Sequence, residues 1–247
     1  MRIRSLIEDT FEKNVKGLIP DLHEFNLNHD GAEGDWLTKK MGLSVNGRNE
    51  PDFMGFEMKK HSRGKTTFGD WSPDEALYKA PSKELDREKF LELFGSPNAN
   101  KYGRYSWSGT VFPKVGKFNS YGQMLAVDGE KNILATYTHE KNSIAFSKVK
   151  IPQRYTKGEI VLAKWSHKTL RRKVESKFNQ RGWFRCLKNS EGAYDRLQFG
   201  GPINFENFIQ LFMHGTIYLD CGMHQVNPRP YMNFRASNEL WNALAEK

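Results

Sequence analysis

The segment PDFMGFEMK at residues 51–59 decides the fold that we predict for this chain. Its apolar residues predict a short strand, and its central glycine predicts a turn at the start of that strand. Because alternate residues of a strand share a face, Glu57 and Lys59 are expected to project to the same side. A bend at Gly55 brings Asp52 toward that side. Two carboxylates and one ammonium group are therefore expected to converge here.

Helical and strand patterns alternate on both sides of this segment. Apolar spacing and capping signals predict helices at residues 3–16, 31–42, 82–94, 167–178 and 203–214, and at the C-terminal end. Runs of β-branched and aromatic residues predict strands within residues 50–71, 105–112, 122–129, 132–140, 159–165, 182–188, 193–199 and 215–223. The step Asp128-Gly129 is a hairpin signal. This order favours the α/β class, with a mixed sheet flanked by helices.

The composition indicates an anionic partner. The 247 residues include 38 Lys and Arg against 29 Asp and Glu, which gives a net charge of +9. A surface this basic attracts polyanions, and nucleic acid is the commonest of them. Cations alternate with aromatic residues in KYGRYSW and NQRGWFRCLK, as is typical of phosphate contacts beside stacked rings. The alternative is a basic surface with no specialised partner.

The residues of the 51–59 segment suit hydrolysis of a phosphodiester. Paired carboxylates such as Asp52 and Glu57 bind Mg²⁺ through hard oxygen ligands, and the metal lowers the pKa of its bound water. Lys59 can orient that water or stabilise charge on the phosphorus. The carbonyl group of Met58, between the two side chains, is an expected further ligand. The alternative is a solvated strand face, since such spacings also arise by chance.

Several protein classes are excluded or not supported. No apolar run reaches the ~20 residues of a membrane helix, and the N-terminus lacks a secretory signal, so we expect a cytoplasmic protein. Cys186 and Cys221 lie in apolar runs and are predicted to be buried free thiols. The scattered histidines have no metal-ligand spacing, and no glycine loop for ATP phosphates is present.

The run GAEGDWLTKKMGLSVNGRNEPDFMGFEMKK at residues 31–60 resembles the MvaI/BcnI family of restriction endonucleases. It resembles more distantly the mismatch-repair nicking enzyme MutH; all are PD-(D/E)xK nucleases. The likeness continues in order through residues 59–73, 165–178, 205–224 and 233–237. It implies a type II enzyme that cuts double-stranded DNA with Mg²⁺, using Asp52, Glu57 and Lys59. The helix at 165–178 matches one that packs behind the family's active site.

The resemblance also implies an organisation and partners. We expect residues 1–247 to form a single nuclease unit with two lobes around a DNA cleft. Residues of about 1–95 and 155–215 are predicted as the catalytic lobe, and about 96–154 and 216–247 as the DNA-recognition lobe. The family implies a monomer that cuts the strands one at a time. A cognate DNA methyltransferase is expected to act on the same site without needing to bind the enzyme.

Candidate DNA-binding residues lie in two places. His61, Arg63 and Lys65 follow the predicted catalytic segment and match a basic segment of the family. The alternative for His61, which the residue alone favours, is a surface histidine. In the tail, His224, Arg229 and Arg235 are candidate base readers, because arginine commonly reads guanine. For Arg229, between two prolines, the alternative is a solvated side chain in a turn of the chain.

Two departures from the family pattern bear on function. Relatives carry a glutamate on the glycine-led helix where this chain has Thr38, and only the nearby Glu33 and Asp35 offer a substitute. The tail reads Asn-Pro-Arg-Pro-Tyr at residues 227–231 instead of a His-Asp-rich turn, so the recognised DNA sequence is expected to differ. Two other functions stay open: a MutH-like nicking enzyme of repair, and a non-catalytic DNA-binding module.

Overall fold

The computed structural model describes residues 3–23, 31–44, 48–62, 64–79 and 84–246, which form two compact units. Unit 1 consists of Met1–Thr66, Arg171–Phe205 and Ser237–Lys247, and unit 2 consists of Thr67–Leu170 and Glu206–Ala236. The units differ from the expected lobes, because residues 67–95, 155–170 and 206–215 belong to unit 2 and residues 237–247 belong to unit 1. The roles of the two lobes in catalysis and DNA recognition stay a prediction.

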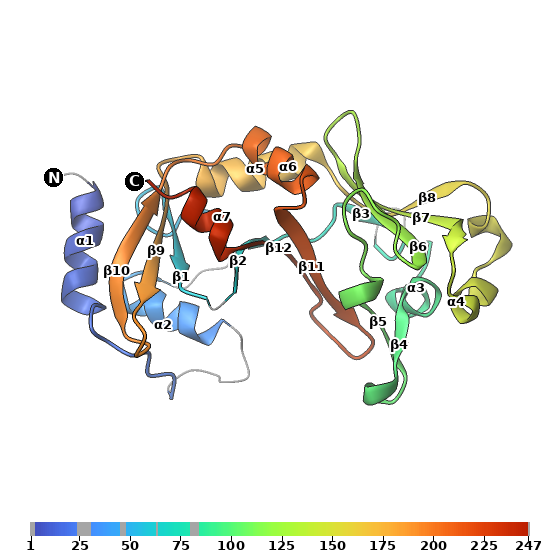
Figure 1. Ribbon diagram of the computed structural model, residues 1–247, viewed down its shortest axis with the longest axis horizontal. Coiled ribbons are helices and arrows are strands. Elements are labelled where there is room, and N and C mark those ends of the chain that lie inside the picture. Colours follow the sequence, from blue (N-terminus) through green and yellow to red (C-terminus); the bar gives the residue numbers. More distant parts are fainter. Residues whose placement is uncertain (1–2, 24–30, 45–47, 63, 80–83, 247) are drawn as a thin grey trace. The chain divides into compact units, whose positions relative to one another are not determined.

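Unit 1 is built on a three-stranded sheet in the order β1-β9-β10 (Figure 1). Strand β1 runs parallel to β9, and β10 runs antiparallel to β9. The strands are β1 (Phe56–Lys60), β9 (Gly182–Lys188) and β10 (Tyr194–Gly200). The helices are α1 (Ile3–Asn14), α2 (Ala32–Lys40), α5 (His167–Phe178), which begins in unit 2, and α7 (Asn238–Ala243). Since β1 is an edge strand of this sheet, the backbone of its outer edge is open to other groups.

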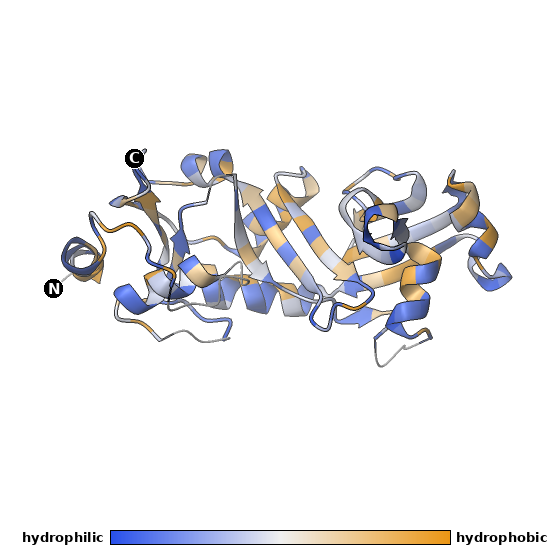
Figure 2. Ribbon diagram, turned by 90° about the horizontal axis from the view of Figure 1, so that it is seen from below, coloured by the Kyte–Doolittle hydropathy of each residue, from blue (hydrophilic) through white to orange (hydrophobic). Residues whose placement is uncertain are grey.

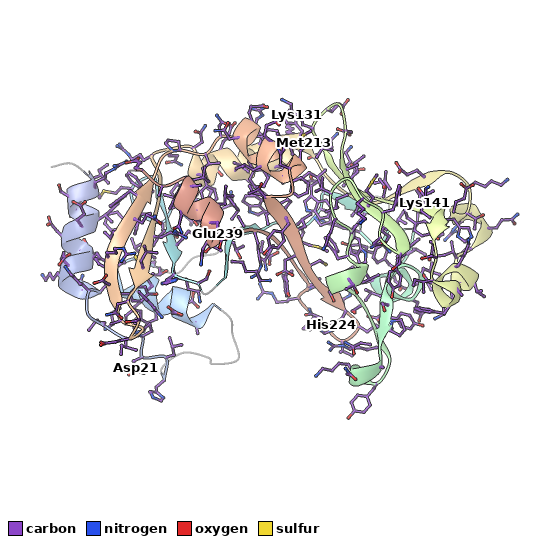
Figure 3. The ribbon with its side chains drawn as sticks, viewed as in Figure 1. Asp21, Lys131, Lys141, Met213, His224 and Glu239 are labelled. Atoms are coloured by element: carbon purple, nitrogen blue, oxygen red, sulfur yellow. The ribbon has the colours of Figure 1, made fainter. Side chains whose placement is uncertain are left out.

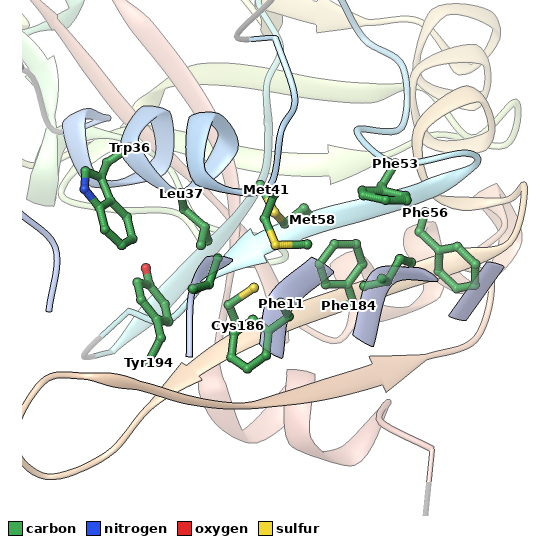
Figure 4. Packing of buried hydrophobic residues seen from close by; sticks show 12 residues of the cluster. Phe11, Trp36, Leu37, Met41, Phe53, Phe56, Met58, Phe184, Cys186 and Tyr194 are labelled. Atoms are coloured by element: carbon green, nitrogen blue, oxygen red, sulfur yellow. The ribbon is translucent and has the colours of Figure 1, made fainter. Parts of the chain in front are cut away.

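One face of this sheet carries an apolar core formed with α1 and α2 (Figure 4). Helix α1 contributes Ile7 and Phe11, which lie one turn apart and are fully buried. The rings of Trp36 and Tyr194 stack with their centroids 5.8 Å apart. Truncating a buried phenylalanine to alanine in such a core typically costs ~3–5 kcal/mol. The core therefore fixes β1 firmly against the rest of unit 1.

The opposite face of the sheet is covered by α5 and α7. Trp183 of β9 packs edge-on against Trp241 of α7, with ring centroids 4.9 Å apart. Phe178 at the end of α5 lies 6.2 Å from the same Trp241 ring. In the β1–β9 register Glu57 pairs with Trp183, so the two predicted catalytic side chains of β1 lie on this covered face.

Unit 2 contains a five-stranded sheet, β2-β12-β11-β5-β4, and a four-stranded sheet, β3-β8-β7-β6. Apolar and polar residues alternate along β11 and β12, as expected for a sheet with one face on a core (Figure 2). The first sheet comprises β2 (Lys65–Asp70), β12 (Tyr231–Ser237), β11 (Ile217–His224), β5 (Arg104–Ser108) and β4 (Ser96–Asn98). The second comprises β3 (Glu75–Ala76), β8 (Glu159–Trp165), β7 (Ile133–Asn142) and β6 (Tyr121–Val127).

Helices α3 (Arg87–Phe94), α4 (Ala145–Lys150) and α6 (Phe205–Met213) complete unit 2, with short 3-10 turns at Ala99–Lys101, Gly109–Val111 and Gln153–Tyr155. Phe234 of β12 packs against Phe208 and Phe212 of α6. The buried Gln123 accepts a hydrogen bond from the Trp107 indole at 2.6 Å and donates to the carbonyl oxygen of Phe94 at 2.7 Å. This amide ties β6 to β5 and to α3.

Most predicted elements are confirmed, and the differences have local causes. The helix expected at residues 82–94 begins at Arg87, because Asp86 caps it and accepts the Lys89 N–H at 2.6 Å. Residues 82 and 83 lie outside the described residues. The second half of the tail loop forms β12. Both cysteines are buried free thiols, as predicted. Among the described residues, no helix is long and apolar enough to cross a membrane.

Candidate active site

A two-residue turn between Phe53 and Phe56 shapes the predicted catalytic segment. The N–H of each of these residues donates to the carbonyl of the other, at 2.9 and 2.8 Å. Met54 and Gly55 between them have φ values of +46° and +90°, the backbone of a type I′ turn. A Cβ on Gly55 would lie only 3.1 Å from side-chain carbons of Arg181. Glycine suits position 55 because it adopts a positive φ without strain and has no Cβ that would crowd Arg181.

The turn returns the chain so that Asp52 lies beside β1. Its Oδ2 accepts the backbone N–H of Met58 at 2.9 Å. In an extended strand, the N–H and C=O of one residue point to the same edge. The carbonyl oxygen of Met58 therefore points to the edge of β1 that Asp52 occupies.

Glu57 is buried between two ammonium groups. Its side chain is 2% exposed, and its Oε1 lies 2.7 Å from Lys59 Nζ and 3.1 Å from Lys177 Nζ. Its Oε2 is buried and has no hydrogen-bond partner among the described residues. Burial raises the pKa of Glu57 above its usual value, although both lysines oppose this shift. The desolvation of the carboxylate thus outweighs the attraction of the lysines.

Lys59 is held in a partly apolar setting. Its side chain is 12% exposed, and Nζ lies 5.3 Å from the centre of the Phe178 ring. Burial lowers the pKa of Lys59, and the carboxylate of Glu57 opposes this shift. The Lys59 ammonium group therefore gives up its proton more readily than that of a solvated lysine.

Lys177 reaches Glu57 because α5 is tied to the segment that precedes Asp52. The Asn49 amide donates to the carbonyl of Lys173 at 2.8 Å and to Ser176 Oγ at 2.9 Å. Ser176 Oγ in turn donates to the carbonyl of Asn49 at 3.0 Å. These contacts fix the last turn of α5 beside the catalytic segment.

Glu33 does not join the carboxylates of Asp52 and Glu57. Its Oε1 accepts from Lys188 Nζ at 2.6 Å and from the Tyr194 hydroxyl at 2.8 Å. Burial alone raises the pKa of Glu33, but these two hydrogen bonds hold it below its usual value. The Thr38 hydroxyl donates to the carbonyl of Gly34 in its own helix at 2.9 Å.

The predicted DNA-binding residues after β1 have different environments. Nδ1 of His61 accepts the backbone N–H of Lys188 at 3.0 Å, and burial lowers the pKa of His61, with the nearby Arg185 adding to the shift. Lys65 is exposed at the start of β2, and Arg63 lies outside the described residues. The lowered pKa favours the neutral form of His61, which accepts a hydrogen bond at Nδ1.

Arg185 braces the segment that follows β1. It is buried and donates to the amide oxygens of Gln198, Asn238 and Asn242. Asn238 donates in turn to the carbonyl of Ser62 at 2.8 Å. Helix α7 is thus connected to the residues that come directly after β1.

The three candidate base readers all lie in unit 2, on or between β11 and β12. Arg235 Nε lies 3.0 Å from Asp220 Oδ2 across the two strands, and both side chains are partly buried. His224 is the last residue of β11 (Figure 3). Its Nδ1 forms a hydrogen bond with the carbonyl oxygen of Gln225. Arg229 is exposed in the connecting turn.

Comparison with known proteins identifies the family. The model of the LlaMI restriction endonuclease family matches residues 15–247. This chain belongs to the LlaMI restriction endonuclease family. It is 41% identical to the type II restriction enzyme ScrFI of Lactococcus lactis subsp. cremoris, over 96% of this chain and 94% of the relative. The structure of the restriction endonuclease MvaI with its cognate DNA substrate matches with a TM-score of 0.64 and 13% identity, over 100% of this chain and 97% of that chain.

These findings confirm three predictions from the sequence. The fold matches that of MvaI, as the 31–60 segment indicated. The protein is a type II restriction endonuclease, and hence a nuclease that cuts DNA. The interpretation as a non-catalytic DNA-binding module is not supported. Type II restriction enzymes typically require a divalent metal ion.

The side chains of this restriction endonuclease suit such an ion. No group of three or more His, Cys, Asp or Glu side chains lies together among the described residues, so the carboxylates of Asp52 and Glu57 are the acidic pair available at β1. The buried Oε2 of Glu57 lacks a donor and can accept a cation in its place. Hard oxygen ligands of this kind fit Mg²⁺ or a similar ion.

Sequence reasoning missed one charged group of this site, Lys177. The helix at 167–178 was expected to pack behind the active site, but no residue of it was singled out for catalysis. Lys177 precedes Phe178, the only large apolar residue in the last turn of that basic helix. A lysine next to the apolar residue that packs a helix against the core can be expected to bury its ammonium group, and this signal could have identified Lys177.

Proposed function

We propose that this enzyme hydrolyses double-stranded DNA at a specific sequence with Mg²⁺, and that Asp52, Glu57 and Lys59 form its catalytic centre. The observation that carries this proposal is the convergence at β1. Asp52 Oδ2 accepts the backbone N–H of Met58 at 2.9 Å. The buried Glu57 forms an ion pair with Lys59, with Oε1 and Nζ 2.7 Å apart. Paired carboxylates beside an ammonium group match the chemistry of metal-assisted phosphodiester hydrolysis.

Asp52, Glu57 and the carbonyl oxygen of Met58 would hold the metal ion. Mg²⁺ binds through few carboxylates and keeps several waters, which suits a site with two acidic side chains. When bound, the ion supplies Lewis-acid polarisation of the phosphodiester and of the attacking water. The N–H of Met58 keeps the Asp52 carboxylate in place for this task.

Lys59 positions the attacking water. Its ammonium group lies beside Glu57 Oε1, and the Phe178 ring limits its movement. A cation in this place also stabilises negative charge that develops on the phosphate. Lys177 of helix α5 contacts the same oxygen, Glu57 Oε1. Ionic contacts from both sides keep the Glu57 carboxylate in one position.

DNA contacts are assigned to both units. His61, Arg63 and Lys65 are proposed to contact the DNA beside the cleaved bond. Arg235, Arg229 and His224 are proposed to read bases. We further propose that the enzyme acts as a monomer, and that a cognate methyltransferase modifies the same site without binding to it. The cytoplasmic location stays a prediction.

Incubation of the protein with plasmid DNA and Mg²⁺ tests the function. Discrete linear fragments support site-specific restriction. Open circles as the final product indicate the MutH-like nicking alternative, and intact plasmid contradicts both. A parallel incubation with EDTA should leave the plasmid intact, because the acidic pair has no other way to activate water.

Alanine variants of Asp52, Glu57 and Lys59 test the site itself. Each should lose cleavage, by at least a hundredfold, while specific binding remains, because affinity comes mainly from phosphate contacts elsewhere. Cleavage and gel-shift assays on one DNA fragment measure both quantities. Near wild-type cleavage by any of the three variants would show that the site is assigned to the wrong residues.

A further inference from the structure

Two turns of unit 2 lie side by side at the same end of neighbouring strands in its five-stranded sheet. The 98–104 turn connects β4 to β5, and the 224–230 turn connects β11 to β12. His224 pairs with Ser106, and the Gln225 N–H donates to the Tyr105 carbonyl at 3.0 Å. Figures 1 and 3 show the two turns on the same side of unit 2, with His224 at the end of β11. The two turns therefore form one surface.

Each turn exposes one large apolar side chain in a strained backbone conformation. Tyr102 is fully exposed at 105% and has a φ of +56°; Val226 is 79% exposed and has a φ of +61°. Positive φ is a genuine outlier for bulky and β-branched residues. Neither side chain gains burial in return for this strain. Strained positions of this kind are enriched at ligand-binding sites, so the two turns are candidates for a ligand contact.

The surroundings of these side chains favour an anionic ligand. Neither turn contains an acidic residue, whereas Lys101, Arg104 and Arg229 lie within them. Arg104 Nε is buried and has no hydrogen-bond partner among the described residues. A buried donor of a charged group costs free energy until it finds an acceptor. Because this Nε is enclosed, a phosphate oxygen can supply that acceptor only when the Arg104 side chain turns outward.

The enzyme acts on DNA, and DNA combines phosphates with an apolar base stack. Proteins that distort DNA insert apolar side chains between base pairs while cations hold the flanking phosphates. Resting on the proposed function, we propose that the 98–104 and 224–230 turns form a DNA-distorting surface. Tyr102 and Val226 enter a groove of the bound duplex and unstack a base step, and Arg104 binds an adjacent phosphate.

Glycine substitutions separate this role from a purely structural one. Glycine adopts positive φ without cost, so Val226→Gly and Tyr102→Gly should keep or raise the Tm. Both should lower kcat/KM for plasmid cleavage, by roughly tenfold or more, because a base contact is lost. Val226→Ile, which keeps a branched apolar side chain, should cleave like the wild type.

Lys131→Gly is the matched control. Lys131 is also a non-glycine residue with positive φ, +64°, but it lies in the β6–β7 turn, well apart from His224 (Figure 3). It should change cleavage little. Wild-type cleavage by Val226→Gly and Tyr102→Gly overturns the proposal, as does a loss of cleavage that comes with a loss of stability.

Permanganate oxidation of thymines gives a direct readout, since it requires unstacked bases. The probe is a duplex with a mapped cleavage site, bound by Asp52→Ala so that it is not cut. Enhanced reactivity that disappears when Val226→Gly or Tyr102→Gly is added supports the proposal, and uniform protection overturns it. If the wild type leaves plasmid intact, the proposed function fails. A duplex that the protein binds in a gel shift then replaces the mapped site, and its permanganate pattern decides the role of the turns.

Discussion

Glu57 shares one carboxylate oxygen between Lys59 and Lys177, while its other oxygen lacks a partner. Together with Asp52, the two acids and two ammonium groups sum to zero formal charge. A divalent cation that enters therefore meets a site already neutralised by the lysines. Protons compete as well, because burial raises the pKa of Glu57. Metal binding should thus depend on pH.

Lys177→Met should move the acid limb of the cleavage–pH profile to higher pH. Lys177 favours the ionised form of Glu57, so its removal raises the pKa of that carboxyl further. The carboxyl is ionised only above its pKa, and the metal needs the ionised form. Cleavage rates at saturating Mg²⁺ between about pH 5 and 9 measure the limb.

The control for this experiment is Lys168→Met, which removes an exposed lysine from the same helix. Its acid limb should stay within a few tenths of a unit of the wild type. A limb of Lys177→Met that stays in place or moves to lower pH would contradict the role of Lys177 at Glu57.

Arg235→Ala should lower affinity for the cognate site by ~1–3 kcal/mol and change random-DNA binding little. The ion pair with Asp220 orders the guanidinium, which lowers the entropy cost of a specific contact. Arg229→Ala distinguishes a base reader from a phosphate contact, and a solvated side chain at this exposed position would leave both affinities unchanged. A base reader loses cognate affinity alone, whereas a phosphate contact weakens both DNAs and lowers the salt slope by about one. Affinities for both DNAs at two salt concentrations decide between them.

At the residue scale, the sequence predicts those side-chain contacts that depend only on residues close together in the chain. Asp52, Glu57 and Lys59 converge because a tight turn and a strand are local structures. Lys177 could not be predicted, because α5 meets β1 only through tertiary packing. The pairing of Arg235 with Asp220 depends in the same way on the register of two strands.

At the element scale, the turn before β1 controls the position of Asp52. Gly55→Ala should destabilise the enzyme by roughly 1–2 kcal/mol, since φ is +90° there and the new methyl group meets Arg181. Cleavage should fall as well, because the turn aligns Asp52 with Met58.

Met54→Asn should raise the Tm, because Asn-Gly is the favoured sequence of a type I′ turn. Thermal unfolding and cleavage assays on both variants measure these effects, and a Gly55→Ala enzyme as stable as the wild type would contradict them.

Element boundaries follow local signals, whereas element partners do not. The Asp86 cap sets the start of α3, and such a cap can be read from the sequence. The parallel pairing of β1 with β9 cannot, because unit 2 residues lie between them in the chain. The Arg185 amide network likewise depends on α7 folding back onto β9 and β10.

At the scale of the whole molecule, the proposed monomer with one proposed catalytic centre should cut the two strands in succession. Cleavage of supercoiled plasmid should pass through a nicked circle before linear product forms. The first-order rate with enzyme in excess should not change with enzyme concentration. Gel analysis of a time course and sedimentation of the enzyme–DNA complex test this. A rate that rises with the square of enzyme concentration would indicate a dimer.

The parallel pairing of β1 with β9 also bears on protein synthesis. A ribosome delivers Asp52, Glu57 and Lys59 early, but β9 and the last turn of α5 follow only after Thr67–Leu170 has been translated. Helix α7, which covers the same face of the sheet, follows β9 and β10 in the chain. Nascent chains that end before β9 therefore carry these three residues without the sheet that arranges them. The three side chains can take up their positions on that sheet only after β9 and the last turn of α5 have been translated.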